Sequence, residues 1–262
     1  MAGILEALGA ARVFDLEQLR YAGAPSHPAH MPGFNYFLHR HHARGAGEAR
    51  TGASGIVVMP DHSGTHIDAL AHQAENLTLY GGVHVDEGVQ TSVGFRVLGI
   101  DTMAPLVTRG VLLDVAGAKR LAPEHSITVD ELERAAKAAR VEIRAGDTVL
   151  IRTGYGALWS DPAEYLRGAG VSAAGSTWLI DKKVSAVGAD NMAWDVMGPK
   201  DPDLGVTLPG HILLLVRAGI PIIENLNLEE LAAAKVHEFA FVCLPLKMRG
   251  ATGSPVRPIA LA

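Results

Sequence analysis

Short, mostly apolar runs recur along this chain and determine its predicted secondary structure. Several of them are apolar without a break, rather than alternating with polar residues, which is typical of strands covered on both faces. We expect strands over residues 56–59, 95–100, 111–115, 148–152, 184–187, 221–223 and 238–242.

Helix signals are fewer and depend on capping chemistry. The segment Thr128-Val-Asp-Glu131 has the form of a capping box, so a helix is predicted to begin there and to run through Arg140. A second helix is expected to begin near Pro209 and to end at Gly219, with this glycine as the C′ residue, and a third is expected over 227–235, with Asn227 as its N-cap. Strands mixed with a few helices indicate an α/β or α+β domain.

Residues 22–55 are the least regular part of the chain. They are rich in glycine, proline, histidine and arginine, and we expect a long loop or an excursion used in oligomerisation. His39, His41 and His42 lie in this region beside arginines that would repel a cation, so a solvated loop is favoured over a metal tract there. No repeat or linker divides the remainder, and a single domain over 1–262 is expected.

Composition narrows the functional classes. With 48% hydrophobic and 19% charged residues, the 262-residue chain is predicted to fold around a sizeable core. The net charge of −5 argues against a nucleic-acid partner. The only cysteine, Cys243, lies in an apolar run and is expected to be buried and unreactive. Glu6 interrupts the first apolar stretch, and no run reaches the ~18 residues of a membrane span, so a cytoplasmic protein without a membrane partner is expected.

Four side chains capable of binding metal lie within eleven residues: His62, His66, Asp68 and His72. Imidazole and carboxylate groups bind Zn²⁺, Mn²⁺ or Fe²⁺. Their spacing does not form one stripe on a helix, because Asp68 would point away from the face shared by His62 and His66. Gly64 indicates a tight turn instead. We therefore predict an irregular ligand loop that follows the strand over 56–59.

A second pair, His211 and Glu224, is a candidate for the same centre. The helix after His211 leads away by ~12 Å, and the strand that returns to Glu224 covers ~13 Å. Because these two distances are nearly equal, the side chains of His211 and Glu224 can lie side by side. Helix capping by His211 and a solvent-facing Glu224 are equally consistent with the sequence. Five further histidines have no partner pattern: His27, His30, His84, His125 and His237.

The segment from His62 to His72 resembles the His-x-Gly-Thr-His-x-Asp-x-Pro-x-His signature of the cyclase-like metal hydrolases, a family that includes bacterial kynurenine formamidase and isatin hydrolase. Only Leu70 departs from the pattern, where the family usually has proline. Further segments that look like family landmarks are 109–114, 152–154, 188–190, His211 with 224–226, and 253–255.

The resemblance implies a role for each candidate. His62, His66 and Asp68 would hold a metal, and His72 would be the catalytic acid/base. His211 and Glu224 would bind a second ion or lie around the first ion and the substrate. One or two Mn²⁺ or Zn²⁺ ions are implied. The family fold is a compact α/β domain of the swivelling β/β/α type, with a mixed, β-barrel-like sheet and flanking helices, which assembles as homodimers or homotetramers.

The expected function is hydrolysis of the C–N bond of a small cyclic amide, a lactam or imide, by metal-activated water. Phe34, Phe37 and Trp194 are candidates for lining an apolar substrate pocket. Two alternatives are an arylformamidase acting on N-formylkynurenine-like formamides and a metal-binding protein without catalysis. The long 22–55 segment and Trp194 favour the isatin-hydrolase-like branch.

Overall fold

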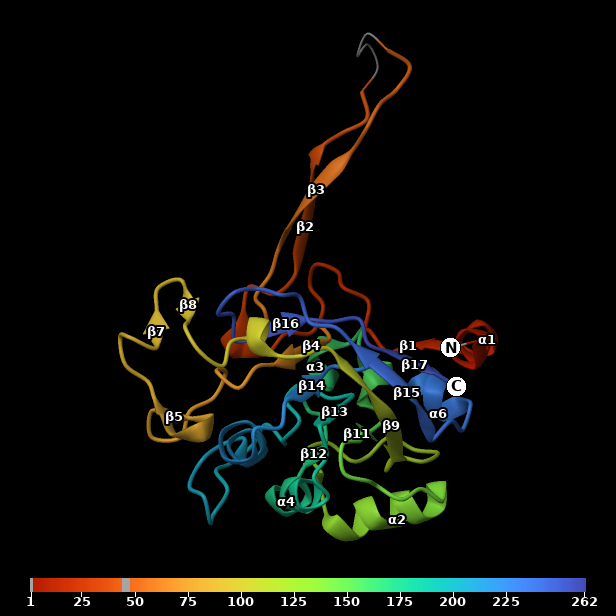
Figure 1. The fold of residues 1–262 in the computed structure, drawn as a ribbon, viewed down its shortest axis with the longest axis vertical. Coiled ribbons are helices and arrows are strands. Elements are labelled where there is room, and N and C mark those ends of the chain that lie inside the picture. The colour runs from red at the N-terminus through yellow and green to blue at the C-terminus, as the bar shows by residue number, and fades with distance from the viewer. Residues whose placement is uncertain (1, 44–47) are drawn as a thin grey trace.

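A curled sheet of nine strands forms the centre of the molecule in the computed structural model, which describes residues 2–43 and 48–262 (Figure 1). In sheet order the strands are β1 (Val13–Asp15), β17 (Ile259–Leu261), β15 (Glu238–Cys243), β9 (Leu106–Asp114), β11 (Thr148–Arg152), β13 (Ala186–Ala189), β14 (Ile222–Glu224), β4 (His66–Asp68) and β16 (Gly253–Pro255). The four central strands, β9, β11, β13 and β14, are parallel. The strands on either side of them are antiparallel.

The central strands are apolar without a break because both faces of the sheet are covered. Along β11, Val149 and Ile151 pack into one hydrophobic cluster, whereas Leu150 between them packs into another on the opposite face. All three side chains are fully buried. This alternation confirms the strand predicted over 148–152, and Cys243 is buried as expected.

Helices and short turns surround the sheet. The helices are α1 (Ala2–Ala10), α2 (Val129–Ala139), α3 (Pro162–Tyr165), α4 (Ala173–Asp181), α5 (Pro209–His211), continued by the π-helix η5 (Ile212–Ala218), and α6 (Glu229–Ala233). The 3₁₀ turns are η1 (Pro28–His30), η2 (Tyr80–Gly82), η3 (Ile100–Thr102) and η4 (Tyr155–Leu158). Paired short strands are β5 (Thr78–Leu79) with β6 (Val83–His84), β7 (Gln90–Thr91) with β8 (Gly94–Phe95), and β10 (Ser126–Ile127) with β12 (Gly170–Val171).

The capping predictions hold for two of the three helices. Thr128 and Glu131 form both hydrogen bonds of the capping box at the start of α2. Gly219 adopts the left-handed conformation just after η5. The third prediction is wrong at its start, because Leu228 is the N-cap of α6, and Asn227 reaches only the amide of Glu229, at 3.4 Å.

One strand prediction and the prediction for residues 22–55 also need correction. The run 95–100 is not a strand beyond Phe95, because Leu98 adopts a positive φ of 59° and the chain turns into η3. The segment 22–55 is not simply a loop. It contains η1 and most of a two-stranded hairpin, β2 (Asn35–Arg40) with β3 (Ser54–Val58), which projects from the body of the molecule (Figure 1). We call residues 34–58 the arm.

The arm also overturns the prediction that the run 56–59 is covered on both faces. Ile56, Val57 and Val58 are 40–51% exposed. Among the described residues, no helix combines the length and apolar character needed to cross a membrane.

Candidate metal centre

A turn and a short strand position the first three ligand candidates. The chain leaves β3, turns at Gly64 with φ of +63°, and enters β4. Because side chains alternate along a strand, His66 and Asp68 share one face of β4, while Ile67 enters the core on the other. The expected irregular loop is therefore partly a strand, and this strand makes Asp68 point the same way as His66.

The imidazoles of His62 and His66 meet the carboxylate of Asp68. His62 Nδ1 lies 2.8 Å from Asp68 Oδ1, and His66 Nε2 lies 3.5 Å from the same oxygen. All three side chains are at most 3% exposed. Such a set of nitrogen and oxygen donors within one small volume can hold a divalent ion.

His211 and Glu224 come to the same place from the other half of the chain. Glu224 stands opposite His66 in the antiparallel pairing of β14 with β4. Glu224 Oε2 lies 3.4 Å from His66 Nε2, and Glu224 Oε1 lies 3.2 Å from His211 Nε2. His211 Nε2 is also 3.7 Å from Asp68 Oδ2. The structure thus brings all five ligand candidates together.

The donor set fits a divalent cation. Asp68 Oδ2 and Glu224 Oε1 are buried, and neither accepts a hydrogen bond from any described residue. Burial, and then the negative charge of Asp68, raises the pKa of Glu224. A cation bound between these carboxylates would offset both the desolvation and the repulsion. Imidazole and carboxylate donors together suit Zn²⁺ or Mn²⁺.

Asp195 orients His211 from the side opposite the carboxylates. Asp195 Oδ2 lies 2.8 Å from His211 Nδ1, and both carboxylate oxygens accept backbone hydrogen bonds, from Gly210 and His211. Burial lowers the pKa of His211, but the carboxylates of Asp195 and Glu224 beside its ring outweigh burial and raise it well above its usual value. A carboxylate on one ring nitrogen directs the other nitrogen toward a metal. Asp195 lies next to Trp194 in the sequence, but no local spacing identifies its role.

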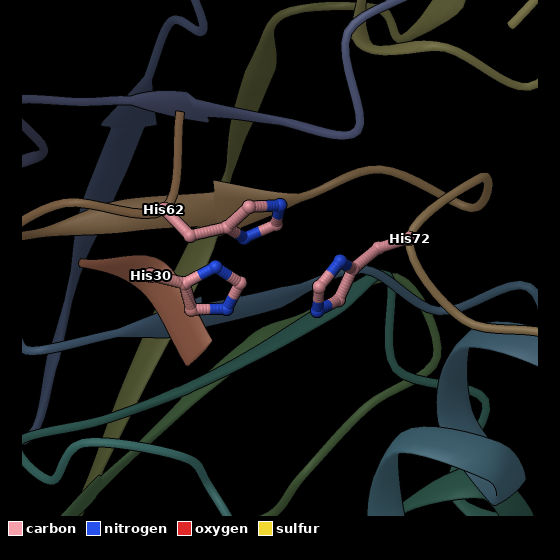
Figure 2. Close-up of side chains that lie close together, drawn as sticks. All are labelled: His30, His62 and His72. Atoms are coloured by element: carbon pink, nitrogen blue, oxygen red, sulfur yellow. The ribbon is translucent and has the colours of Figure 1, made fainter. Parts of the chain in front are cut away.

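Two further histidines, His30 and His72, lie close to His62 (Figure 2). The ring centroids of His72 and His62 are 3.9 Å apart, and the His30 ring stacks on His62 at 4.7 Å. Burial is the main cause that lowers the pKa of His72 to about 3 and that of His30 to about 4. Both rings are therefore neutral near neutral pH. His30 reaches the centre from η1 across a long separation in sequence, which explains why no spacing pattern revealed it.

A cavity of about 280 Å³ opens onto the centre. Its lining residues are His27, Ala29, His30, His66, His72, Gln73, Met192, Ala193, Leu208, His211 and Glu224. Phe34, Phe37 and Trp194 are not among them. Trp194 is fully buried in the core, where its indole N–H donates to Ser176, and Phe37 lies on the arm. The histidines and small apolar residues occupy the positions that we expected aromatic side chains to fill.

Residues that are not ligand candidates hold the turn before β4 in place. Arg20 donates to the carbonyl oxygens of Ser63 and Thr65. Asn225, directly after Glu224, donates to the carbonyl of Gly64 at 2.9 Å. A Cβ atom at Gly253 would lie 2.7 Å from His62 Cε1, so only glycine leaves room for this ring. These contacts fix the ligands before any ion binds.

The chain is similar to known proteins in sequence and in fold. A family model described as "Putative cyclase" matches residues 15–196. Isatin hydrolase of Roseibium aggregatum is 28% identical over 214 residues, which cover 78% of this chain and 73% of that protein. The crystal structure of a novel cyclase superimposes with a TM-score of 0.85 and 26% identity, over 100% of this chain and 90% of that one. Isatin hydrolase A from Ralstonia solanacearum superimposes with a TM-score of 0.75 and 25% identity, over 100% and 95% of the respective chains.

Proposed function

Because the chain belongs to the cyclase family, we propose that it is a metal-dependent hydrolase that cleaves the C–N bond of a small cyclic amide, a lactam or an imide. The observation that carries this proposal is the convergence of three imidazoles and two buried carboxylates beside a cavity. The similarity to isatin hydrolases supports a cyclic amide as the substrate class.

Five residues are proposed as ligands: His62, His66, Asp68, His211 and Glu224. When bound, a Mn²⁺ or Zn²⁺ ion supplies Lewis acidity, which makes hydroxide available near neutral pH. The carboxylates of Asp68 and Glu224 supply the negative charge that attracts the ion. Asp195 keeps the Nε2 lone pair of His211 directed at the same point.

We assign proton transfer to His72. Its ring lines the cavity beside the proposed ligands. Gln73 Nε2 lies 3.2 Å from His72 Nε2. Because an amide nitrogen only donates, His72 Nε2 accepts this hydrogen bond, and the ring carries its proton on Nδ1. To take the proton of the attacking water, the Nε2 lone pair would have to be released from Gln73, and the same nitrogen would then return the proton to the leaving nitrogen.

The cavity supports a small substrate with both polar and apolar edges. Its volume of about 280 Å³ lies just below the ~300–1,000 Å³ of pockets for drug-sized ligands. Met192, Ala193 and Leu208 provide apolar contacts, and the histidines provide hydrogen-bonding groups. A planar ring with one or two carbonyl groups matches this combination of apolar and hydrogen-bonding residues in the cavity wall.

Metal content and turnover test the proposal separately. Wild-type, Asp68→Ala and His72→Ala proteins would be purified without added metal, and Mn and Zn would be quantified by elemental analysis. We expect about one or two equivalents in the wild type and in His72→Ala, and a loss of metal in Asp68→Ala. His72→Ala should lose most of its turnover. A wild-type protein that binds neither metal, even when both are supplied, would refute the proposal.

Two other functions are distinguished by substrate and turnover. An arylformamidase would hydrolyse open-chain N-formyl anilides faster than cyclic imides or lactams, so rates on the two classes are compared on one metal-loaded sample. A non-catalytic metal-binding protein would bind the ion and turn over neither class. The position of His72 at the cavity, beside the proposed ligands, favours the hydrolase, because a purely structural site has no need of a proton carrier.

A further inference from the structure

A buried tyrosine, Tyr165, contacts the residue that follows Glu224. Tyr165 is the last residue of α3 and is fully buried. Its hydroxyl lies 2.9 Å from Asn225 Oδ1 and 3.3 Å from the carbonyl oxygen of Asp190. Because a phenol has one proton and an amide oxygen only accepts, Tyr165 donates to Asn225, the nearer of the two. Burial is the main cause that raises the pKa of this phenol well above its usual value, so the donor keeps its proton.

The backbone of Asn225 is fixed on both sides, which leaves its amide group to be oriented. The residue adopts a left-handed φ of 57°, which asparagine tolerates better than most side chains. Its backbone N–H donates to Asn191 at 3.0 Å, and its carbonyl accepts from the hydroxyl of Thr65 at 2.6 Å. Asn225 is 1% exposed, so each end of its amide needs a partner within the protein.

The two ends of this amide have different partners. Asn225 Oδ1 accepts from Tyr165, while Nδ2 donates to the carbonyl oxygen of Gly64 at 2.9 Å. A reversed amide would place Oδ1 against the Gly64 carbonyl, where two acceptors repel each other, and Tyr165 would lose the oxygen to which it donates. The hydroxyl of Tyr165 therefore stabilises the one orientation in which Asn225 donates to Gly64.

The carbonyl of Gly64 also determines which nitrogen of a ligand candidate carries a proton. It lies 2.8 Å from His66 Nδ1, and since a carbonyl only accepts, Nδ1 is the protonated nitrogen. His66 Nε2 is left to face Asp68 at 3.5 Å and Glu224 at 3.4 Å. Asn225 Nδ2 lies 3.4 Å from His66 Nδ1, and this is a contact rather than a hydrogen bond, because both nitrogens donate to the same oxygen. An amide oxygen in that place would compete with Gly64 for the His66 proton.

We propose that Tyr165 is a positioning residue of the metal centre. Acting through the amide of Asn225 and the carbonyl of Gly64, it holds the Nδ1–H of His66 in place, so that Nε2 of this ring points to the ion. Loss of an outer partner of this kind typically costs a metal site about 10- to 100-fold in affinity. The inference rests on the ligand set of the proposed function, but not on its substrate or reaction.

A pair of tyrosine variants tests this role. Tyr165→Phe removes the hydroxyl and leaves the ring, and we expect the dissociation constant for Zn²⁺ to rise about tenfold in competition with a chromogenic chelator. Tyr155→Phe is the matched control, because Tyr155 is fully buried in the same apolar cluster and its hydroxyl has no hydrogen-bond partner among the described residues. The control should keep the affinity of the wild type. Circular dichroism reports whether each variant keeps its fold.

A double-mutant cycle tests whether Tyr165 acts through Asn225. Asn225→Gly removes the amide and keeps the left-handed backbone, which glycine adopts freely. It should weaken metal binding at least as much as Tyr165→Phe. Adding Tyr165→Phe to Asn225→Gly should then change the dissociation constant by less than about twofold. Additive losses in the double variant would overturn the proposal, as would an unchanged affinity in Tyr165→Phe or equal losses in the two tyrosine variants.

Nuclear magnetic resonance follows the His66 proton in metal-free protein. With ¹⁵N in histidine alone, the Nδ1–H of His66 should give a slowly exchanging signal, which is assigned by its absence from His66→Gln. Tyr165→Phe and Asn225→Gly should each speed its exchange with water, whereas Tyr155→Phe should not. An equally protected signal in both of the first two variants would also overturn the proposal. Because this signal needs no ion, a wild type that bound no metal would refute the proposed hydrolase and leave the link between Tyr165 and His66 to be decided by the exchange rates.

Discussion

Replacing Asp195 by asparagine isolates the contribution of one buried carboxylate to the metal centre. Its oxygens now accept from the Gly210 amide at 2.7 Å and lie 2.8 Å from His211 Nδ1. Asparagine has only one acceptor oxygen. If that oxygen serves Gly210, the amide NH₂ faces His211 Nδ1, and the imidazole must carry its proton on Nε2 instead. That nitrogen is the one 3.2 Å from Glu224 Oε1, where an ion would need its lone pair.

The alternative orientation of the new amide does not avoid the cost. With the oxygen turned to His211, the NH₂ would face the N–H of Gly210, and a buried donor would lose its acceptor at about 1–3 kcal/mol. Either way we expect metal affinity to fall by about 10- to 100-fold, or about 1.4–2.7 kcal/mol. Competition with a fluorescent chelator at fixed pH measures this directly.

A matched variant separates orientation from general destabilisation. Asp147 is also a buried carboxylate, and it accepts from Arg109 and from the amide of Arg144, neither of which is a ligand candidate. Asp147→Asn should lower the free energy of unfolding and leave metal affinity unchanged. The reasoning is wrong if Asp195→Asn binds the ion as tightly as the wild type while remaining folded.

Three further predictions concern stability. Burial, which outweighs four donated hydrogen bonds, raises the pKa of Asp190 from 3.8 to about 6. The folded chain therefore binds this proton more tightly than the unfolded chain, and the wild type should lose about 2 kcal/mol relative to Asp190→Asn as pH rises from 4 to 6. Urea titrations would contradict this if the free energies of unfolding of the wild type and Asp190→Asn differed by the same amount at both pH values. Thr128→Ala removes the hydroxyl that accepts from the Glu131 amide but keeps the backbone N–H that donates to the Glu131 side chain, and it should cost about 1 kcal/mol in the same assay, whereas Thr128→Ser should cost less. Mn²⁺ or Zn²⁺ at a hundred times its dissociation constant should raise the free energy of unfolding by about 2.7 kcal/mol, and a chelator should reverse this gain. Equal melting temperatures with and without metal would show that metal binding does not stabilise the fold.

The elements that sequence predicted well carry strong local signals. The capping box at Thr128 and the glycine after η5 act through neighbouring residues, so their chemistry can be recognised without a fold. The unbroken apolar run of β11 likewise reflects burial on both faces. The same kind of run gave a wrong prediction at β3, because apolar residues do not by themselves identify what covers them, and those of β3 are partly exposed.

The parts of the site that sequence did not reveal depend on distant contacts. Alternation along β4 aligns His66 with Asp68, but the partner strand that brings Glu224 opposite His66 follows more than a hundred residues later. His30 approaches His62 only through the path of η1. Trp194 shows that neighbours in sequence need not share a role. Asp195 orients His211, whereas the side chain of Trp194 packs in the core.

The register of three short strands has a consequence for how the gene can change length. Glu224 on β14 faces His66, and Gly253 on β16 faces Asp68, with β4 between them. Side chains alternate along each strand, so losing one codon within any of the three would exchange the residues that face the centre with those that face the core. Substitutions can accumulate gradually here, but insertions and deletions cannot. Descendants that keep the metal centre should differ in length in the loops between these strands and not within them.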